Sequence, residues 1–439
     1  TTLDGRDLAG SRRLTETDTI TFYRESTSVA GEMRFNTSIW EYIGPSGGPN
    51  EMIVRNRYAV SLDGSVKSAT RDLTGLGISS SSKCIPFITG IMNNAASDDA
   101  DAGTAIAYLS DATTLTVLKG GTDTPNVTVY ITLVEFTGSN WTVLHGDSGT
   151  SALDSGTITL KDNADGTSGT TTSVSDWANA IIFGQHIGDT ASAGTNDALS
   201  DNWPVFEENA ALDIVDWSFN TDHDGNGRHF VHVLNNSSLS VERYSSNTSN
   251  LEGESTIALS TPLKSLNEAF VVGSSTSSGT SASYPRGWRN YYLNDVNTLA
   301  HWAHRSGNTM KHELQVVDFS GLSSFAPGGI SSNLTLWLRA DDGVENASDV
   351  AALDGETVIN WLDGSLNEND ATQNSSSARP LYSDSGINFN PTVDFDGTNH
   401  ELLANISADD NTTIYAVTEG SFNSTDRTLI IITDPSSRE

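Results

Sequence analysis

The side chains best suited to chemistry in this sequence are oxygen ligands in one short turn, Asp222-His-Asp224-Gly-Asn226-Gly. Oxygen-bearing side chains at alternate positions, with a glycine for the sharp bend, match the first half of a calcium-binding loop. The twelfth position of such a loop is Val233 instead of Glu, so the second half of the pattern is missing. The same residues also suit an Asx-rich turn without a metal. The pattern therefore predicts a Ca²⁺ site at Asp222, Asp224 and Asn226, with the plain turn as the alternative.

A second candidate is His145-Gly-Asp147-Ser148-Gly149, which looks like the surroundings of the serine in trypsin-type proteases. A nucleophilic serine needs a base and an orienting acid placed around it. The corresponding place further along the chain reads Leu234-Asn-Asn-Ser-Ser238, which lacks the histidine, the acid and both glycines. The glycines and the acid therefore suit a turn, and we expect the chain not to be an enzyme.

One acidic residue recurs beside large apolar residues near four strand ends: Glu41, Glu135, Asp216 and Asp318. One acid per repeat cannot form the carboxylate pair that hydrolyses glycosides. Because strand side chains alternate between faces, the acid lies opposite its large neighbours. We expect each one to cap a backbone group or to face solvent.

Histidines and aromatics supply weaker candidates. Three histidines fall near one hairpin: His301, His304 and His312. They could bind a metal, but the favoured interpretation is an exposed polar hairpin. Aromatic side chains that could stack on sugar rings, or pack within the hairpin, are Trp288, Tyr291, Tyr292 and Trp302.

The elements that must position these residues are strands. Of the 439 residues, 36% are hydrophobic and 18% are charged, and the alternating apolar runs are separated by clusters of Ser, Thr, Asn, Asp and Gly. That pattern predicts an all-β fold. The net charge of −33 argues against nucleic acids and anionic membranes as partners, because both would be repelled. Cys84 is the only cysteine, so no disulfide can form within the chain.

Internal similarity predicts tandem antiparallel β-sandwich modules. We expect the stretch 129–138, a long apolar strand, to close a module. Leu14 and Ile20 align with Leu109 and Leu115 of the hairpin before it. We expect the C-terminal part of a module at 1–44, complete modules at 45–138, 139–220 and 221–322, and a linker at 323–332. The joints are very short, which predicts a stiff, rod-like array.

Residues 333–439 have a different composition. The segments Leu-Trp337-Leu-Arg-Ala-Asp341-Asp342-Gly and Phe-Asn-Pro-Thr-Val-Asp394-Phe-Asp396-Gly resemble the opening half of concanavalin-A-like, laminin-G-like jelly rolls of large bacterial surface and secreted proteins. The resemblance implies a partial jelly roll and a calcium site at its rim, formed by Asp341, Asp342, Asp394 and Asp396. Such modules are longer than this one, so we expect the chain to continue at its C-terminal end. Because 1–44 matches only the tail of a module, we expect it to continue at its N-terminal end as well.

These observations favour a structural or adhesive part of an extracellular or cell-surface fibre, stalk or layer, whose partners are copies of itself or surface glycans. The alternative is a glycan-binding accessory region of a larger secreted carbohydrate-active protein. We expect no direct membrane insertion, because no apolar run in the sequence is long enough to span a bilayer.

Overall fold

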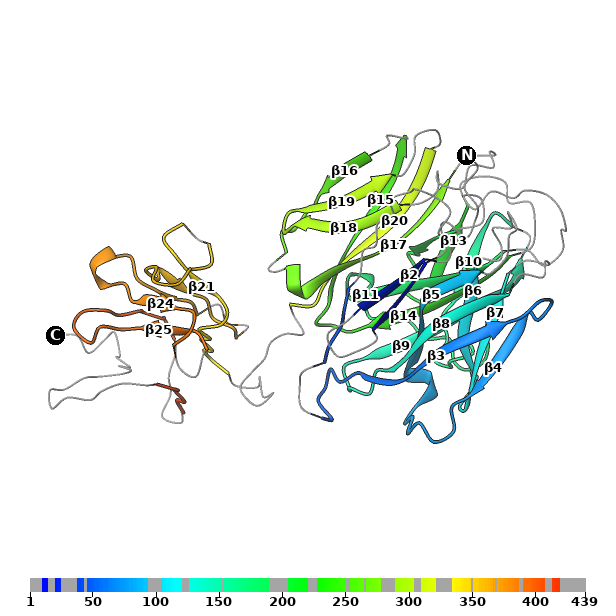
Figure 1. The fold of residues 1–439 in the computed structure, drawn as a ribbon, viewed down its shortest axis with the longest axis horizontal. Coiled ribbons are helices and arrows are strands. Elements are labelled where there is room, and N and C mark those ends of the chain that lie inside the picture. Colours follow the sequence, from blue (N-terminus) through cyan, green and yellow to red (C-terminus); the bar gives the residue numbers. More distant parts are fainter. Residues whose placement is uncertain are drawn as a thin grey trace. The chain divides into compact units, whose positions relative to one another are not determined.

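The computed structural model describes the chain in stretches separated by gaps. They are 10–14, 20–24, 38–42, 46–93, 104–120, 126–151, 153–188, 204–219, 227–249, 253–263, 266–277, 289–303, 309–320, 334–348, 350–365, 367, 369–386, 390–406 and 413–418. The chain divides into two compact units, residues 1–323 and 324–439. The described residues form strands joined by turns and short 3₁₀ segments, which confirms the predicted all-β, antiparallel class (Figure 1).

Three consecutive six-stranded modules make up most of the first unit. The first module contains β3 (Ile53–Leu62), β4 (Ser68–Asp72), β5 (Cys84–Asn93), β6 (Ala105–Asp111), β7 (Thr114–Lys119) and β8 (Val127–Glu135). The second contains β9 (Thr142–Ser151), β10 (Ser155–Thr159), β11 (Ala180–Ile187), β12 (Val205–Glu208), β13 (Ile214–Ser218) and β14 (Gly227–Asn235). The third contains β15 (Ser240–Ser249), β16 (Gly253–Ala258), β17 (Ala269–Ser277), β18 (Arg289–Asp295), β19 (Thr298–Ala303) and β20 (Thr309–Asp318).

The three modules share one topology. In each, the third, sixth and first strands form one antiparallel sheet, and the second, fifth and fourth strands form the other. A 3₁₀ segment precedes the third strand every time: η2 (Ser81–Lys83), η4 (Trp177–Asn179) and η5 (Leu266–Glu268). Backbone hydrogen bonds from Phe136, Asn236 and Phe319 to the last residue of these segments occupy equivalent places. The modules can therefore be compared residue by residue.

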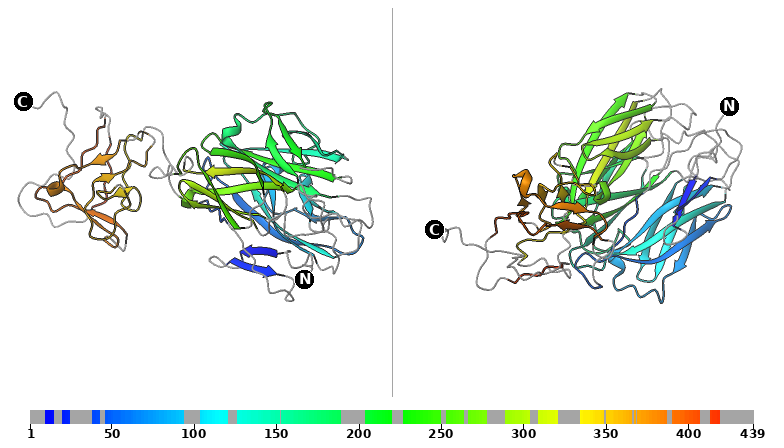
Figure 2. Two further views of the ribbon diagram at one scale, coloured as in Figure 1. Left: turned by 90° about the horizontal axis from the view of Figure 1, so that it is seen from above. Right: turned by 60° about the vertical axis from the view of Figure 1, so that its left-hand side comes forward.

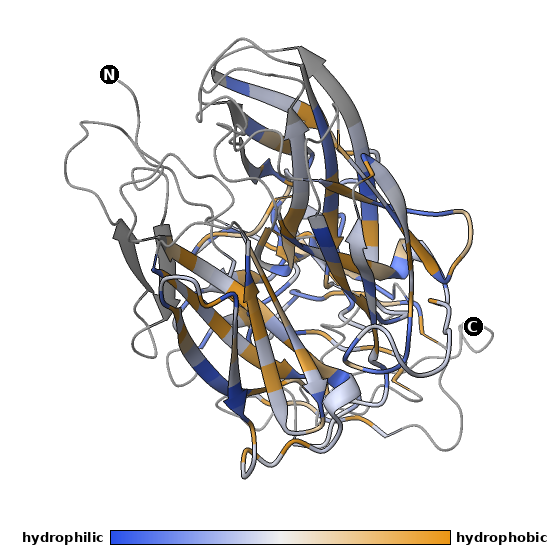
Figure 3. Cartoon of the chain, turned by 90° about the vertical axis from the view of Figure 1, so that its right-hand side faces the viewer, coloured by the Kyte–Doolittle hydropathy of each residue, from blue (hydrophilic) through white to orange (hydrophobic). Residues whose placement is uncertain are grey.

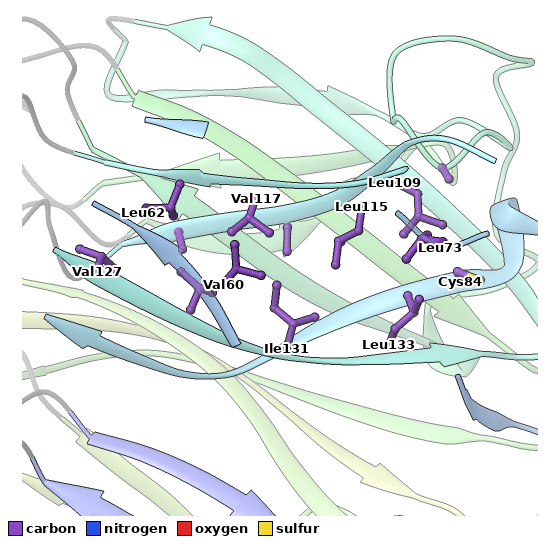
Figure 4. Close-up of a cluster of buried hydrophobic side chains, with 14 residues drawn as sticks. Val60, Leu62, Leu73, Cys84, Leu109, Leu115, Val117, Val127, Ile131 and Leu133 are labelled. Atoms are coloured by element: carbon purple, nitrogen blue, oxygen red, sulfur yellow. The ribbon is translucent and has the colours of Figure 1, made fainter. Parts of the chain in front are cut away.

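The core of the first module lies between its two sheets. Val60 and Ile131 come from one sheet and Leu115 from the other, and all three side chains are buried (Figure 4). Apolar and polar residues alternate along the strands, as a half-buried sheet requires (Figure 3). Each fully buried aliphatic side chain contributes about 1.5–3 kcal/mol by leaving water.

Strand pairing places one module boundary differently from the sequence prediction. β14 pairs with β9 and β11, which both lie in the expected module 139–220. By pairing, β14 therefore closes that module instead of opening the expected module 221–322. Val215 and Asp216 lie in β13, the fifth strand, so they do not correspond to the closing strand β8.

The rod-like array is wrong for these modules. A rod brings together only neighbouring modules, yet one hydrophobic cluster joins Ile85 of the first module, Ile181 of the second and Phe270 of the third. We call this set the central cluster; its other buried members are Val134, Phe136, Trp141, Val143, Leu234, Leu239, Val241 and Val317. The outer faces of the three sheets carry these apolar side chains, and their burial against one another stabilises the arrangement.

The N-terminal segment adds a hairpin to the first module. β1 (Gly10–Leu14) pairs with β2 (Ile20–Arg24), and β1 also pairs with β5 through Ser11 and Gly90 (Figure 2). The hairpin β6–β7 contacts β11 in the same way, through a pairing of Ala105 with His186. The two hairpins thus have corresponding positions on successive modules.

The second unit contains only short strands among its described residues. They are β21 (Val344–Glu345), β22 (Asn360–Trp361), β23 (Ala371–Thr372), β24 (Leu381–Ser383) and β25 (Thr392–Asp394), with the 3₁₀ segment η8 (Ser376–Ala378). A small core forms around Val344 and Val358. The jelly-roll resemblance of 333–439 stays a prediction.

Candidate functional site

The predicted calcium ligands Asp222, Asp224 and Asn226 lie outside the described residues. Along the chain they fall between the end of β13 and the start of β14. Within the described residues, no group of three or more His, Cys, Asp or Glu side chains could hold a metal ion. The Ca²⁺ site stays a prediction from the sequence.

The serine-protease-like residues do not form a catalytic arrangement. The Asp147 carboxylate forms an ion pair with Arg228, with 2.5 Å between Oδ2 and Nη2. The Ser148 hydroxyl accepts a hydrogen bond from the His229 backbone N–H and donates one to the Gly149 carbonyl. The imidazole of His145 instead reaches the preceding module. Each group has a structural partner in place of a triad partner.

A buried histidine pair lies at the joint between the first and second modules. His145 on β9 and His232 on β14 are both fully buried, and their Nδ1 atoms are 2.8 Å apart. His145 Nε2 lies 3.0 Å from the Ser82 carbonyl oxygen, and His232 Nε2 lies 3.2 Å from that of Ala107. Both carbonyls belong to the first module. The pair therefore fastens the second module to the backbone of the first.

Burial controls the protonation of this pair. It lowers the pKa of His145 to about 4, although the Ser82 carbonyl and Asp165 favour the charged form. It also lowers the pKa of His232 well below its ordinary value, and the neighbouring His145 adds to that effect. Both imidazoles are thus neutral near neutral pH and carry one N–H each. One of the two donates Nδ1–H to the other, and only the histidine that accepts this bond can donate its Nε2–H to a carbonyl of the first module.

The joint between the second and third modules uses the same two positions with different residues. Arg243 pairs with Gln315 in the β15–β20 register, as His145 pairs with His232. The Arg243 guanidinium donates to the carbonyls of Trp177 and Ala180, each at 2.5 Å. The Gln315 amide accepts from the Ile182 N–H and donates to its carbonyl, both at 2.8 Å. At both joints, two paired side chains contact the backbone of the preceding module, and His145, His232 and Gln315 among them are buried.

Carboxylates near the second joint form a partly buried group. Lys311 on β20 forms an ion pair with Glu207 on β12 and lies 3.7 Å from Glu313. Burial and the nearby Glu207 raise the pKa of Glu313 to about 7, against the hydrogen bond from Ser245 and the charge of Lys311. This joint therefore also contains a group that titrates near neutral pH.

The recurring acids have structural roles where the structure describes them. Glu135 is fully buried, and its carboxylate accepts hydrogen bonds from Ser79, Ser80 and Arg55. Burial raises its pKa, but these bonds outweigh burial and hold the pKa below its usual value. Asn235 has the same register position in the second module and accepts from Ser175. Glu135 thus caps backbone N–H groups in the turn before the 3₁₀ segment, as expected.

The other three recurring acids do not cap the turn that Glu135 caps. Asp318 has the position of Glu135 in the third module and accepts from the Ser320 N–H. Asp216 lies in β13, where both of its carboxylate oxygens accept from the Asn209 amide. Glu41 is exposed. Nothing brings these carboxylates together.

Two of the hairpin histidines are buried, so the expected exposed polar hairpin is wrong for them. His301 and His312 are 5% and 1% exposed, and their ring centroids lie 5.4 Å apart. The Tyr291 hydroxyl lies 2.7 Å from His312 Nδ1, and the Tyr292 hydroxyl donates to Glu254. His304, Trp288 and the side chain of Trp302 lie outside the described residues.

The acids of the predicted rim site in the second unit each have local partners. Asp341 forms an ion pair with Arg339, and Asp342 lies 4.0 Å from the same guanidinium. Asp394 accepts from the Thr392 hydroxyl, and Asp396 accepts from the N–H of Thr398 in its own turn. The structure does not group the four as ligands of one ion.

Trp40 has a packing role that the sequence did not indicate. Its ring lies 5.8 Å from Phe87, 6.1 Å from Phe183, 4.5 Å from Phe270 and 5.4 Å from Phe319, between ring centroids. These four residues come from all three modules. The available signal was its place beside Glu41, one of the recurring acids that lie next to large apolar residues. Trp40 thus links the ends of the three-module unit.

Comparison with known proteins finds no matching family model, no matching curated protein and no matching solved structure. Within the part of the chain that the structure describes, no helix is long and apolar enough to cross a membrane.

Proposed function

We propose that this chain is a structural or adhesive component of an extracellular fibre, stalk or cell-surface layer. The observation that carries the proposal is the construction of the module joints. Side-chain pairs, His145 with His232 and Arg243 with Gln315, bond the backbone of the preceding module. Separating the modules would remove these partners from the buried side chains of His145, His232 and Gln315, at a cost of about 1–3 kcal/mol for each hydrogen bond lost.

The side chains that could take part in catalysis support the same proposal. Glu135, Asp147 and His145 are all held by structural hydrogen bonds or ion pairs. A group already fixed in this way contributes to rigidity, which a load-bearing or surface-displayed protein needs. The net charge of −33 suits an exposed molecule in a saline medium, where it prevents non-specific contact with anionic polymers.

The proposal is tested with the full chain by two measurements in parallel. Electron microscopy over a range of protein and salt concentrations should show ordered assemblies, and an immobilised polysaccharide array should show no retention specific to one sugar. Specific retention without assembly would support the glycan-binding alternative and overturn the structural role.

A further inference from the structure

A lysine and two glutamates meet where the second module contacts the third. Lys311 on β20 forms an ion pair with Glu207 on β12, so the two charges come from different modules. Glu313 lies two residues further along β20, on the same face of the strand, and its carboxylate is 3.7 Å from the Lys311 Nζ atom. The side chains of Lys311, Glu207 and Glu313 are 22%, 30% and 12% exposed. Most of their surface is therefore withdrawn from water.

Two serine hydroxyls hold these groups in place. The Lys311 Nζ donates to the Ser218 hydroxyl at 3.3 Å, and that hydroxyl donates to Glu207 Oε1 at 3.4 Å. The Ser245 hydroxyl donates to Glu313 Oε1 at 2.6 Å. Contacts from both modules thus hold the amine against the Glu207 carboxyl group. Two reacting groups held in a productive geometry within one molecule can reach an effective concentration on the order of 10⁵ M or more.

Glu313 keeps a proton available beside this pair. Burial and the nearby Glu207 raise the pKa of Glu313 to about 7, against the hydrogen bond from Ser245 and the charge of Lys311. A carboxyl group with this pKa exists in both forms near neutral pH, so it can give a proton and take one back. The joint therefore contains an amine, a carboxyl group for the amine to attack, and a third group that can move protons between them.

We propose that the Lys311 amine and the Glu207 carboxyl group join in an amide bond, which links the second and third modules covalently. Lys311 first passes one ammonium proton to the Glu207 carboxylate. The Nζ–Cδ bond then forms, and the bond from Cδ to the protonated oxygen breaks. Glu313 donates a proton to that oxygen, which departs as water, and takes one proton from the nitrogen. Atoms and charges balance without an oxidant or a co-reactant.

The amide suits this joint better than the ion pair does. A charge that is held away from water costs free energy of desolvation, and an amide carries no charge. The link adds to Arg243 and Gln315, which hold the same joint through hydrogen bonds to the backbone. It goes beyond the proposed function and does not depend on it, because the bond forms within one chain whatever that chain assembles with.

Mass spectrometry of the full chain tests the proposal. We expect the purified and denatured wild type to be lighter than its sequence by the mass of one water molecule. After proteolysis, the peptides that contain Lys311 and Glu207 should be joined through these two side chains, which distinguishes the bond from water loss at an Asp-Gly turn. A mass equal to that of the sequence, or a water loss located elsewhere, would overturn the proposal.

Three variants test the roles of the individual residues. K311R keeps the positive charge, but a guanidinium stays protonated and cannot attack, so its mass should equal that of its sequence. E313Q keeps the shape of the side chain but cannot carry the proton, so the linked fraction should rise about a hundredfold more slowly after expression. E208Q is the matched control, because Glu208 is the next residue on β12 and pairs with Arg243, and it should form the bond as wild type does. Equal rates in wild type and E313Q would refute the assigned proton transfer.

Discussion

The buried histidine pair predicts that the first joint weakens in mild acid. The perturbation is a lowering of the pH from about 7 to about 5, which crosses the unfolded-state pKa of histidine. The folded-state pKa of His145 is about 4, against an ordinary value of 6.5. Between these values the unfolded chain binds more protons, so the free energy of unfolding falls as the pH falls. The full difference corresponds to about 3 kcal/mol for His145, and His232 acts in the same direction.

Glu313 acts with the opposite sign over part of the same range. Its folded-state pKa of about 7 lies above the ordinary 4.5, so its contribution to stability is lost as the pH rises through that interval. The stability of the whole protein is therefore flatter with pH than the histidines alone would make it. A comparison of two proteins that both keep Glu313 isolates the histidine effect.

The assay is urea unfolding of wild type and of the double variant H145Q/H232Q, followed by tryptophan fluorescence at a series of pH values. Glutamine can donate to the Ser82 and Ala107 carbonyls at every pH, as Gln315 does at the second joint. The variant should lose less unfolding free energy than wild type between about pH 7 and about pH 5. The measured quantity is the change in unfolding free energy with pH. A lower stability of the variant at every pH therefore does not hide the effect. Equal slopes would refute the assignment of neutral, joint-holding histidines.

Three further predictions concern the joints. Trp40→Ala should lower the free energy of unfolding by about 2–4 kcal/mol, because it removes contacts with four aromatic rings. The control is Ile39→Ala, a neighbouring residue that is 63% exposed, which should change this free energy by about 0.5 kcal/mol or less. Equal effects of the two variants in urea unfolding would contradict the packing of Trp40 on the central cluster. Gln315→Ala should cost about 2–4 kcal/mol in the same measurement, because it leaves the Ile182 N–H and carbonyl unpaired, and a neutral result would argue against that contact. Glu313→Gln should reduce the loss of stability between about pH 5 and about pH 8, and an unchanged pH profile would show that Glu313 is not the group that titrates there.

Strand alternation made much of the fold predictable. Short apolar runs separated by Gly, Asn and Asp turns predict antiparallel strands, and the recurrence of an acid beside large residues pointed to a repeat. The boundary near residue 220 was misplaced because Val215-Asp216-Trp217 imitates the pattern of Val134-Glu135-Phe136. The true closing strand of the second module has Asn235 at that position, which the acidic pattern could not find.

The arrangement of the modules could not be read from the sequence. Short linkers indicate that modules stay close together, but a direct joint allows a compact cluster as readily as a rod. The choice between a cluster and a rod depends on apolar residues on the outer faces of the sheets, such as Ile85, Ile181 and Phe270. These residues contact others that are distant in the chain. The histidine pair could not be predicted for the same reason, because His145 and His232 meet only through the pairing of β9 with β14.

The central claim is that the central cluster joins the three modules so that they unfold together. Scanning calorimetry of the full chain tests it most directly, because cooperative units are seen as separate transitions. We expect one transition for residues 1–323, with a calorimetric enthalpy equal to the van't Hoff enthalpy, beside any separate transition of residues 324–439. Three successive transitions, one for each module, would contradict it.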